Sequence, residues 1–218
     1  MTVTSSPSPA VSTAGCVPSS RDARARLSVI AQSAHHLMTL RRDELEACAA
    51  AVATAVARGA DIYTLGNGGS ATTASHLTCD LTSRPVVGDR LARAHTVHDL
   101  ARTTAVANDD GYDEVFATPL RGLLRGGDLL IAISVSGRSS NVVRALALAR
   151  RRKVTTMALL GSDGGEARSL ADVDLVVPCD DPGVVESVHL AVVHEIASLL
   201  RESKDADDIS RQFHQGGD

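Results

Sequence analysis

The fold and the candidate chemistry of this chain depend on one stretch, residues 63–80, which reads YTLGNGGSATTASHLTCD. It begins inside a short apolar run that predicts a buried strand, and the glycine-rich turn Gly66–Ser70 follows at once. A helical pattern starts behind the turn, with Ser70 as the expected N-cap residue. A strand, a glycine turn and a helix start together present free backbone N–H groups to an anion. Farther along this helix, His76 and Asp80 are four residues apart and therefore share one face.

The composition indicates one aliphatic core. The chain has 218 residues, 44% of them hydrophobic, but no Trp and only two Tyr and two Phe. That length supports a single core, which must be built from aliphatic and alanine side chains. Few aromatic rings are left to stack on nucleic-acid bases, and the net charge of −4 provides no general affinity for polyanions. We therefore expect no nucleic-acid partner.

Cysteine usage and the two chain ends favour a cytoplasmic protein. The four cysteines are Cys16, Cys48, Cys79 and Cys179. They show no CxxC spacing, so free thiols in a reducing cytoplasm are expected. The absence of a run of about 18 apolar residues predicts no membrane span. Residues 1–20 do not resemble a secretory signal and are interpreted as a disordered lead, residues 21–203 as a single domain, and residues 204–218 as a flexible tail.

Strand and helix patterns alternate along the domain. The expected strands are 61–65, 94–98, 129–133, 154–160 and 173–177. The expected helices after the first strand are 70–82, 100–107, 112–124, 141–151, a short one after 161–165, and 184–201. This alternation predicts an α/β fold with a doubly wound, five-stranded parallel sheet. An N-terminal helical arm, residues 21–58, breaks near residues 40–42 and ends at Gly59; it packs either on a partner subunit or on its own sheet.

A second loop has the composition of a phosphate site. Residues 134–139, Ser-Val-Ser-Gly-Arg-Ser, follow the most apolar strand and precede a helix. Short hydroxyl groups and backbone N–H groups at a helix N-terminus suit a phosphate dianion. In a doubly wound sheet, this loop and Gly66–Ser70 both lie at carboxyl strand ends and can face one crevice. A dinucleotide is a poorer candidate ligand, because no GxGxxG motif followed by an acidic residue is present.

Titratable residues provide the candidate chemistry. His76 and Asp80 could ligate a metal or act as a base with its partner. In the final helix, His194 lies among apolar residues, so a desolvated imidazole is expected there. His95 and His98 are weaker candidates, interpreted as lying on one strand face.

The ordered set of these motifs resembles the phosphoheptose isomerases of the SIS-domain superfamily, over about residues 24–202. The motifs are Gly66–Ser70 with His76, then Ala107–Asp109, then Ile133–Ser139, then Glu186, His189 and His194. The resemblance implies conversion of sedoheptulose 7-phosphate to a D-glycero-heptose 7-phosphate, usually the D-glycero-D-manno isomer, for nucleotide-heptose biosynthesis. It also implies a homotetramer with active sites between subunits, and often a zinc ion.

Carried over position by position, the resemblance implies the site residues. The implied sugar-phosphate contacts are Asn67, Gly68, Gly69, Ser70, Asn108, Asp109, Ser134, Val135, Ser136, Ser139 and Glu186. The implied catalytic residues are Asp80 and His194, and the implied Zn²⁺ ligands are His76, Asp80, Glu186 and His194.

This chain departs from the family pattern at three positions. Asp80 stands where the family has a glutamate, Glu186 where it has a glutamine, and Gly183 where it often has an aspartate. We expect Asp80 to take the carbon proton and His194 to move the oxygen proton, with the opposite assignment as the alternative. Eight residues of regular helix, about 12 Å, separate Glu186 from His194. The two can share one ion only if the helix is bent or starts later, or if they come from different subunits.

Two other interpretations compete with an isomerase. Some SIS-domain tetramers bind a protein partner, such as a replication initiator, but these lack the set formed here by His76, Asp80 and His194. A sugar-phosphate sensor would usually carry a DNA-binding domain. Residues 1–20 are too short for one, and residues 21–58 show no recognisable turn between recognition helices.

Overall fold

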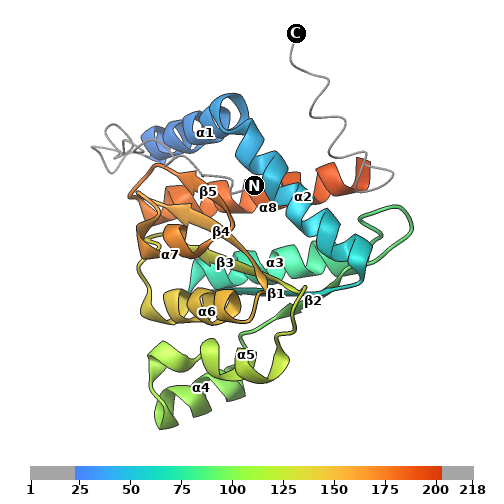
Figure 1. The fold of residues 1–218 in the computed structure, drawn as a ribbon. Coiled ribbons are helices and arrows are strands. Elements are labelled where there is room, and N and C mark those ends of the chain that lie inside the picture. The colour runs from blue at the N-terminus through green and yellow to red at the C-terminus, as the bar shows by residue number, and fades with distance from the viewer. Residues whose placement is uncertain (1–22, 203–218) are drawn as a thin grey trace, which may run out of the picture.

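The computed structural model describes residues 23–202. The expected disordered lead, Cys16 and the expected tail lie outside the described residues. The structure contains a five-stranded sheet in which all strands are parallel, in the order β2-β1-β3-β4-β5. The strands are β1 (Asp61–Gly66), β2 (Arg93–Thr96), β3 (Leu129–Ser134), β4 (Thr155–Gly161) and β5 (Val173–Val177). This is the predicted doubly wound α/β fold (Figure 1).

The helices agree with the predicted alternation, with one exception. They are α1 (Ala23–Leu40), α2 (Arg42–Arg58), α3 (Gly69–Ser83), α4 (Leu100–Asp109), α5 (Ala117–Leu123), α6 (Ser140–Arg151), α7 (Gly165–Leu170) and α8 (Pro182–Glu202). The single helix predicted over 112–124 is instead a short 3₁₀ turn, η1 (Tyr112–Glu114), followed by α5. The predicted break in the N-terminal arm is confirmed, and Gly59 ends α2 with φ +67°.

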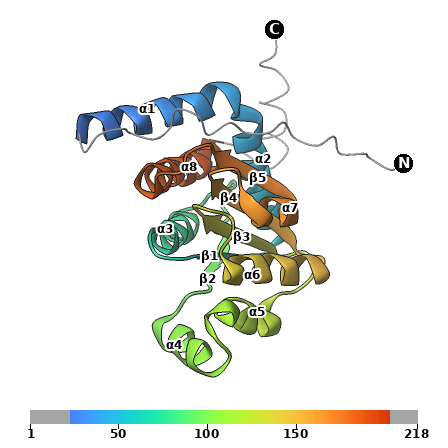
Figure 2. The same cartoon turned by 90° about the vertical axis from the view of Figure 1, so that its left-hand side faces the viewer.

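The side chains of each strand point alternately to the two faces of the sheet, which divides the core into two layers. In β3, Leu129, Ile131 and Ile133 pack on the face covered by α2, α3 and α8, whereas Leu130 and Ala132 pack on the face covered by α5 and α6. Successive side chains of a strand point to opposite faces, so an apolar run becomes two hydrophobic layers. Figure 2 shows the resulting order of helices, sheet and helices. α1 lies outside α8 and contacts it, whereas α2 contacts β1, β3 and β5, so within one chain the arm covers both α8 and one face of its own sheet.

Three local expectations are wrong. Ser70 is not the N-cap of α3: Gly68 is, because its positive φ of +54° lets the helix begin at Gly69. β2 ends at Thr96, so His98 lies beyond the strand and does not share a strand face with His95. Cys179 is disulfide-bonded and not free, whereas Cys48 and Cys79 are free thiols.

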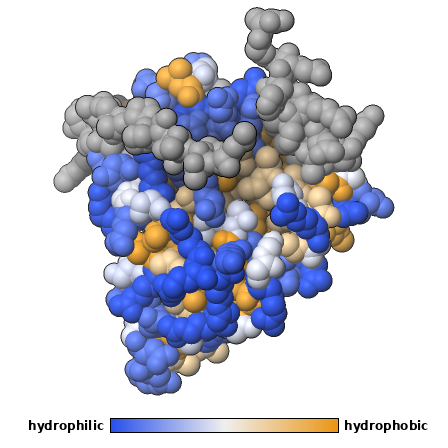
Figure 3. Space-filling view, in the orientation of Figure 1, coloured by the Kyte–Doolittle hydropathy of each residue, from blue (hydrophilic) through white to orange (hydrophobic). Residues whose placement is uncertain are grey.

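α8 is a core helix. By length and composition alone it could cross a membrane, but half of its most apolar window is buried inside the fold. Its buried residues include Val188, Val193 and Ile196, which belong to the layer shared with α2 and α3. The face seen in Figure 3 is largely hydrophilic, with apolar residues in small groups between polar ones. Burial in the core therefore accounts for the apolar character of α8.

Candidate active site

The two predicted loops leave the sheet side by side. β1 and β3 are neighbours, and Gly66 is in register with Ile133, so the loops that follow both strands start at the same sheet edge. The chain passes from β1 outward to β2 on one side and returns to β3 on the other. This is the switch point at which doubly wound sheets bind ligands.

The Ser134–Ser139 loop is shaped by its own hydrogen bonds. The Gly137 N–H donates to Ser134 Oγ over 3.1 Å, and the Arg138 N–H donates to Ser136 Oγ over 3.2 Å. Gly137 has φ +62°, and a Cβ there would overlap the backbone of Gly164. Ser139 precedes α6, but its side chain does not cap the helix. The loop therefore brings serine hydroxyls to the start of α6, as an anion site requires.

The Arg138 guanidinium pairs with a neighbouring carboxylate and also donates to the Ser136 carbonyl of its own loop. Its guanidinium lies 2.6 Å from Asp163 Oδ2, and both side chains are about half exposed. This hydrogen bond holds the pKa of Asp163 below its usual value. Val135, which belongs to the same loop, is half-buried against the core.

The Gly66–Ser70 turn offers a ligand its backbone groups and one side-chain amide, that of Asn67. Gly68 is exposed, whereas Ser70 is 3% exposed and its N–H donates to the Asn67 carbonyl over 3.0 Å. Asn67 forms hydrogen bonds with Asn141 and with the Tyr112 hydroxyl. Neither partner was among the predicted site residues.

Asn108 and Asp109 lie apart from these contacts. Both are exposed in the last turn of α4, and Asn108 Nδ2 donates to Asp109 Oδ1 over 2.8 Å.

The structure brings together three of the four predicted metal ligands. Asp80 Oδ2 lies 3.5 Å from His76 Nε2 and 3.3 Å from His194 Nδ1. The two imidazole rings meet edge to face, with centroids 4.5 Å apart. His76 and Asp80 come from α3 and His194 from α8, and these two helices pack against each other. One ligand atom from each residue lies within 4.8 Å of the others, so the three could hold one ion.

An observation on Asp80 supports the fit of a cation. Its Oδ2 atom is buried and has no hydrogen-bond partner among residues 23–202, although it faces both imidazoles. A buried carboxylate oxygen without a donor is costly, and a cation between the three groups would satisfy it. Two histidines and one carboxylate, with a further position open, form a donor set typical of catalytic zinc.

Arg201 completes the surroundings of Asp80. Its guanidinium donates to the Asp80 carbonyl over 3.1 Å and lies 3.8 Å from Asp80 Oδ1. The sequence offered no signal for this residue, because it comes from the far end of α8.

Glu186 occupies a different place. Its carboxylate lies against Gly69 at the start of α3, where a Cβ would overlap it. Glu186 and His194 belong to one continuous α8, and Glu186 is not part of the three-residue group. Within one chain, Glu186 therefore does not share an ion with His194.

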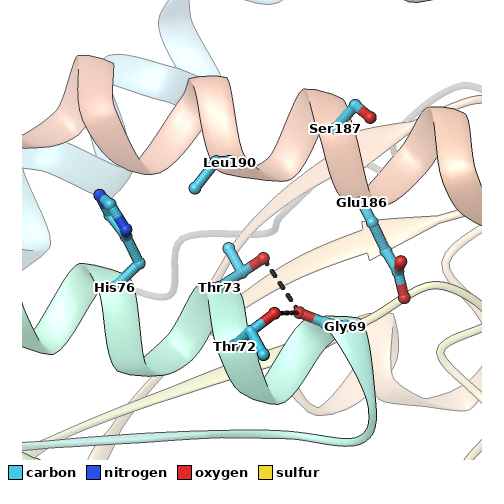
Figure 4. A pocket seen from close by; sticks show the side chains of 7 residues that line it. All are labelled: Gly69, Thr72, Thr73, His76, Glu186, Ser187 and Leu190. Carbon is cyan, nitrogen blue, oxygen red and sulfur yellow. Dashed lines mark hydrogen bonds between the residues drawn. The ribbon is translucent and has the colours of Figure 1, made fainter.

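A groove runs from His76 to Glu186. It encloses about 290 Å³ between α3 and α8, with His76 toward one end and Glu186 at the other (Figure 4). Its other lining residues are Gly69, Thr72, Thr73, Ser187 and Leu190. The hydroxyls of Thr72 and Thr73 donate to the Gly69 carbonyl, so the one donor of each is already used.

The remaining histidines have other surroundings. His194 is not desolvated as expected, since its side chain is 52% exposed. The fully buried histidine of α8 is His189, whose Nε2 donates to the Leu160 carbonyl; burial lowers its pKa to about 4. His95 lies 3.2 Å from Asp61 at the sheet edge. His98 bonds to Ser75 over 2.8 Å, and burial lowers its pKa.

Comparison with known proteins finds one family. The family model of the SIS domain matches residues 27–161. A phosphoheptose isomerase of Pelobacter propionicus is 39% identical over 156 residues, which cover 71% of this chain and 82% of that protein. One from a Nitratiruptor species is 40% identical over 143 residues, covering 65% of this chain and 76% of that protein.

Solved structures lead to the same family. The phosphoheptose isomerase of Neisseria gonorrhoeae superposes with a TM-score of 0.76 at 29% identity, covering 82% of this chain and 96% of that one. The family match, the sequence identity and the shared fold show that this chain belongs to the phosphoheptose isomerase family of SIS-domain proteins.

Proposed function

We propose that this aldose–ketose isomerase converts sedoheptulose 7-phosphate to a D-glycero-heptose 7-phosphate, the D-glycero-D-manno isomer, for nucleotide-heptose biosynthesis. The observation that carries the proposal is the carboxylate of Asp80 between the imidazoles of His76 and His194, at the end of the groove that His76 lines. The named relatives support the substrate, because they are phosphoheptose isomerases.

The substrate phosphate binds in the Ser134–Ser139 loop. There the serine hydroxyls and the N-terminus of α6 supply donors and a favourable dipole. The sugar then extends toward the Gly66–Ser70 turn, which presents Asn67 and the exposed backbone of Gly68. A short phosphate loop and a separate sugar-binding turn set the distance between the phosphate and the reacting carbons.

The reaction needs two proton transfers. Isomerisation moves a proton between C1 and C2 through a cis-enediol, and protons on O1 and O2 are exchanged. Asp80 is the carbon base and His194 the group that moves the oxygen proton, with the reverse assignment as the alternative. Asp80 Oδ2 and His194 Nδ1 lie 3.3 Å apart, so both groups can act on the same pair of substrate carbons.

His76, Asp80 and His194 would hold a zinc ion, with Glu186 as a fourth ligand only if another subunit supplies it. When bound, Zn²⁺ would polarise the substrate carbonyl and stabilise the negative charge of the enediolate. Asp80 would be a weaker base as a tight ligand, so the division of labour between Asp80 and His194 depends on metal occupancy. We further propose a cytoplasmic homotetramer with active sites between subunits.

The deciding experiment is an NMR assay of the purified protein with sedoheptulose 7-phosphate, with and without added Zn²⁺. We expect aldoheptose signals to appear, and their coupling constants to give the configuration at C2. Incorporation of solvent deuterium at the transferred carbon position would support the enediol. No turnover under either condition would contradict the proposal and favour a SIS-domain protein that only binds a partner.

A further inference from the structure

A network of hydrogen bonds joins three side chains at the switch point. The Tyr112 hydroxyl lies 3.0 Å from Asn67 Oδ1. Asn67 Nδ2 lies 2.9 Å from Asn141 Oδ1, and Asn141 Nδ2 lies 3.0 Å from Asn67 Oδ1. The three residues come from η1, from the turn after β1 and from α6, so the network connects both sides of the crevice.

One backbone group determines the direction of every bond in the network. The Val142 N–H donates to Asn141 Oδ1 over 2.9 Å, and an N–H can only donate. The amide atom of Asn141 that faces Val142 is therefore the oxygen. Asn141 Nδ2 must then donate to Asn67 Oδ1, and Asn67 Nδ2 must donate back to Asn141. Because Asn67 Oδ1 is an acceptor, the Tyr112 hydroxyl must be the third donor.

Counting donors and acceptors shows what remains for a ligand. A carboxamide oxygen has two lone pairs, and both on Asn67 are used, by Tyr112 and by Asn141. The Asn67 nitrogen has two N–H groups, of which Asn141 uses one. Asn67 can therefore offer a ligand one N–H donor and no acceptor.

We propose that Tyr112 and Asn141 are positioning residues that fix the Asn67 carboxamide as a hydrogen-bond donor to an oxygen atom of the sugar phosphate. Without them, either end of the amide could face the ligand. The inference rests on the proposed function for the nature of the ligand, but the orientation of the amide follows from the network alone.

Ion pairs place Tyr112 for this role. Arg144, one turn beyond Asn141 on α6, lies 2.6 Å from Glu114 and 3.4 Å from Asp113. These pairs attach η1 to the helix that also carries Asn141. Asn141 is 2% exposed, whereas Tyr112 is 56% exposed and contributes little to the core. The surroundings of Tyr112 therefore favour a positioning role over a packing role.

The first test compares hydroxyl deletions at the two tyrosines of the chain. Tyr112→Phe removes one donor to Asn67. Tyr63→Phe is the matched control, because Tyr63 lies buried on β1 beside His95 of β2 and has no role in the site. One hydrogen bond contributes about 0.5–1.5 kcal/mol, which is about a 2- to 12-fold change. We expect Tyr112→Phe to raise KM for sedoheptulose 7-phosphate by about that factor and to change kcat by less than about 2-fold.

A double-mutant cycle separates positioning from a general structural effect. If Tyr112 acts through Asn67, Tyr112→Phe has no further effect on KM in an Asn67→Ala background. We also expect Asn67→Asp, which replaces the free N–H by an acceptor oxygen, to bind the sugar phosphate no better than Asn67→Ala. An undiminished effect of Tyr112→Phe in the Asn67→Ala protein, or wild-type affinity of Asn67→Asp, would overturn the inference.

The second test does not depend on turnover. The chain contains three asparagines, Asn67, Asn108 and Asn141, so selective ¹⁵N labelling gives three side-chain amide signal pairs. We expect Tyr112→Phe to shift the Asn67 pair and to leave the Asn108 pair in place. If all three pairs stay unchanged, Tyr112 does not donate to Asn67, and the inference is wrong. If the Asn67 pair shifts but the wild type neither binds nor converts sedoheptulose 7-phosphate, the orientation stands, while the proposed function and the donor role toward a sugar phosphate both fail.

Discussion

Asp80 Oδ2 lies 3.3 Å from His194 Nδ1, and this contact connects α3 to α8 at the edge of the groove. The opposite side of the same carboxylate faces Arg201, which donates to the Asp80 carbonyl. Asp80 is thus held from both sides by residues of α8. For the proposed carbon base, such a fixed position favours proton transfer, because the geometry is set before a substrate binds.

Removing the imidazole of His194 should remove most of the activity. We expect His194→Ala to lower kcat by about 10²- to 10⁴-fold, the usual contribution of a general acid–base group. His95→Ala is the matched control, because His95 lies at the sheet edge with Asp61 and should keep full activity. Size-exclusion chromatography should show the same assembly for both variants. Turnover by His194→Ala near the wild-type rate would contradict the assignment.

The length and charge of Asp80 can be tested separately. Asp80→Asn keeps the shape but loses the charge, so we expect kcat to fall by about 10²-fold or more. Asp80→Glu keeps the charge and adds one methylene group, and we expect activity within about 10-fold of wild type. Steady-state assays of both variants provide the measurement. Equal losses in both would show that the position of the carboxylate matters more than its charge.

Zinc binding distinguishes a three-residue site from a four-residue site. We expect His76→Ala to weaken Zn²⁺ binding by more than about 100-fold, because it removes a direct ligand. Glu186→Gln should leave the affinity within about 3-fold, because Glu186 lies against Gly69 and away from the cluster. Equilibrium dialysis of the intact assembly measures both affinities. A large loss in Glu186→Gln would mean that a second subunit supplies Glu186 to the ion.

The buried His189 should make stability depend on pH. Burial lowers its pKa from 6.5 to about 4, although the hydrogen bond to the Leu160 carbonyl partly opposes this shift. The unfolded chain therefore takes up a proton first as the pH falls. The free energy of unfolding therefore has its full value above about pH 6.5. It falls by about 3 kcal/mol as the pH falls toward 4.

His189→Gln keeps a donor for Leu160 but cannot titrate in this range. We expect its free energy of unfolding to fall by about 3 kcal/mol less than that of the wild type between pH 7 and pH 4. Urea denaturation at a fixed protein concentration measures the difference. Parallel pH profiles for the two proteins would show that His189 does not control this loss.

Patterns that are local in the chain were predicted from the sequence. Alternating apolar runs indicated the parallel sheet, and Gly59 indicated the end of α2, because strand period and helix capping depend on neighbouring residues. Local patterns also failed where backbone geometry decided the outcome. Gly68 adopts a positive φ, so α3 begins before Ser70 can cap it. η1 and α5 form two elements where one helical pattern was predicted.

By itself, the sequence determined which residues can carry the chemistry: His76 and Asp80 on one helix face, and two donor-rich loops behind parallel strands. Only the tertiary structure decided which of them meet. His194 reaches Asp80 because α3 packs on α8, whereas Glu186, on the same rigid helix as His194, is carried to Gly69. Tyr112, Asn67 and Asn141 come together because β1 and β3 are neighbours and η1 is attached to α6. Helix and strand periods relate residues a few positions apart, but contacts between elements depend on the order and packing of the whole sheet.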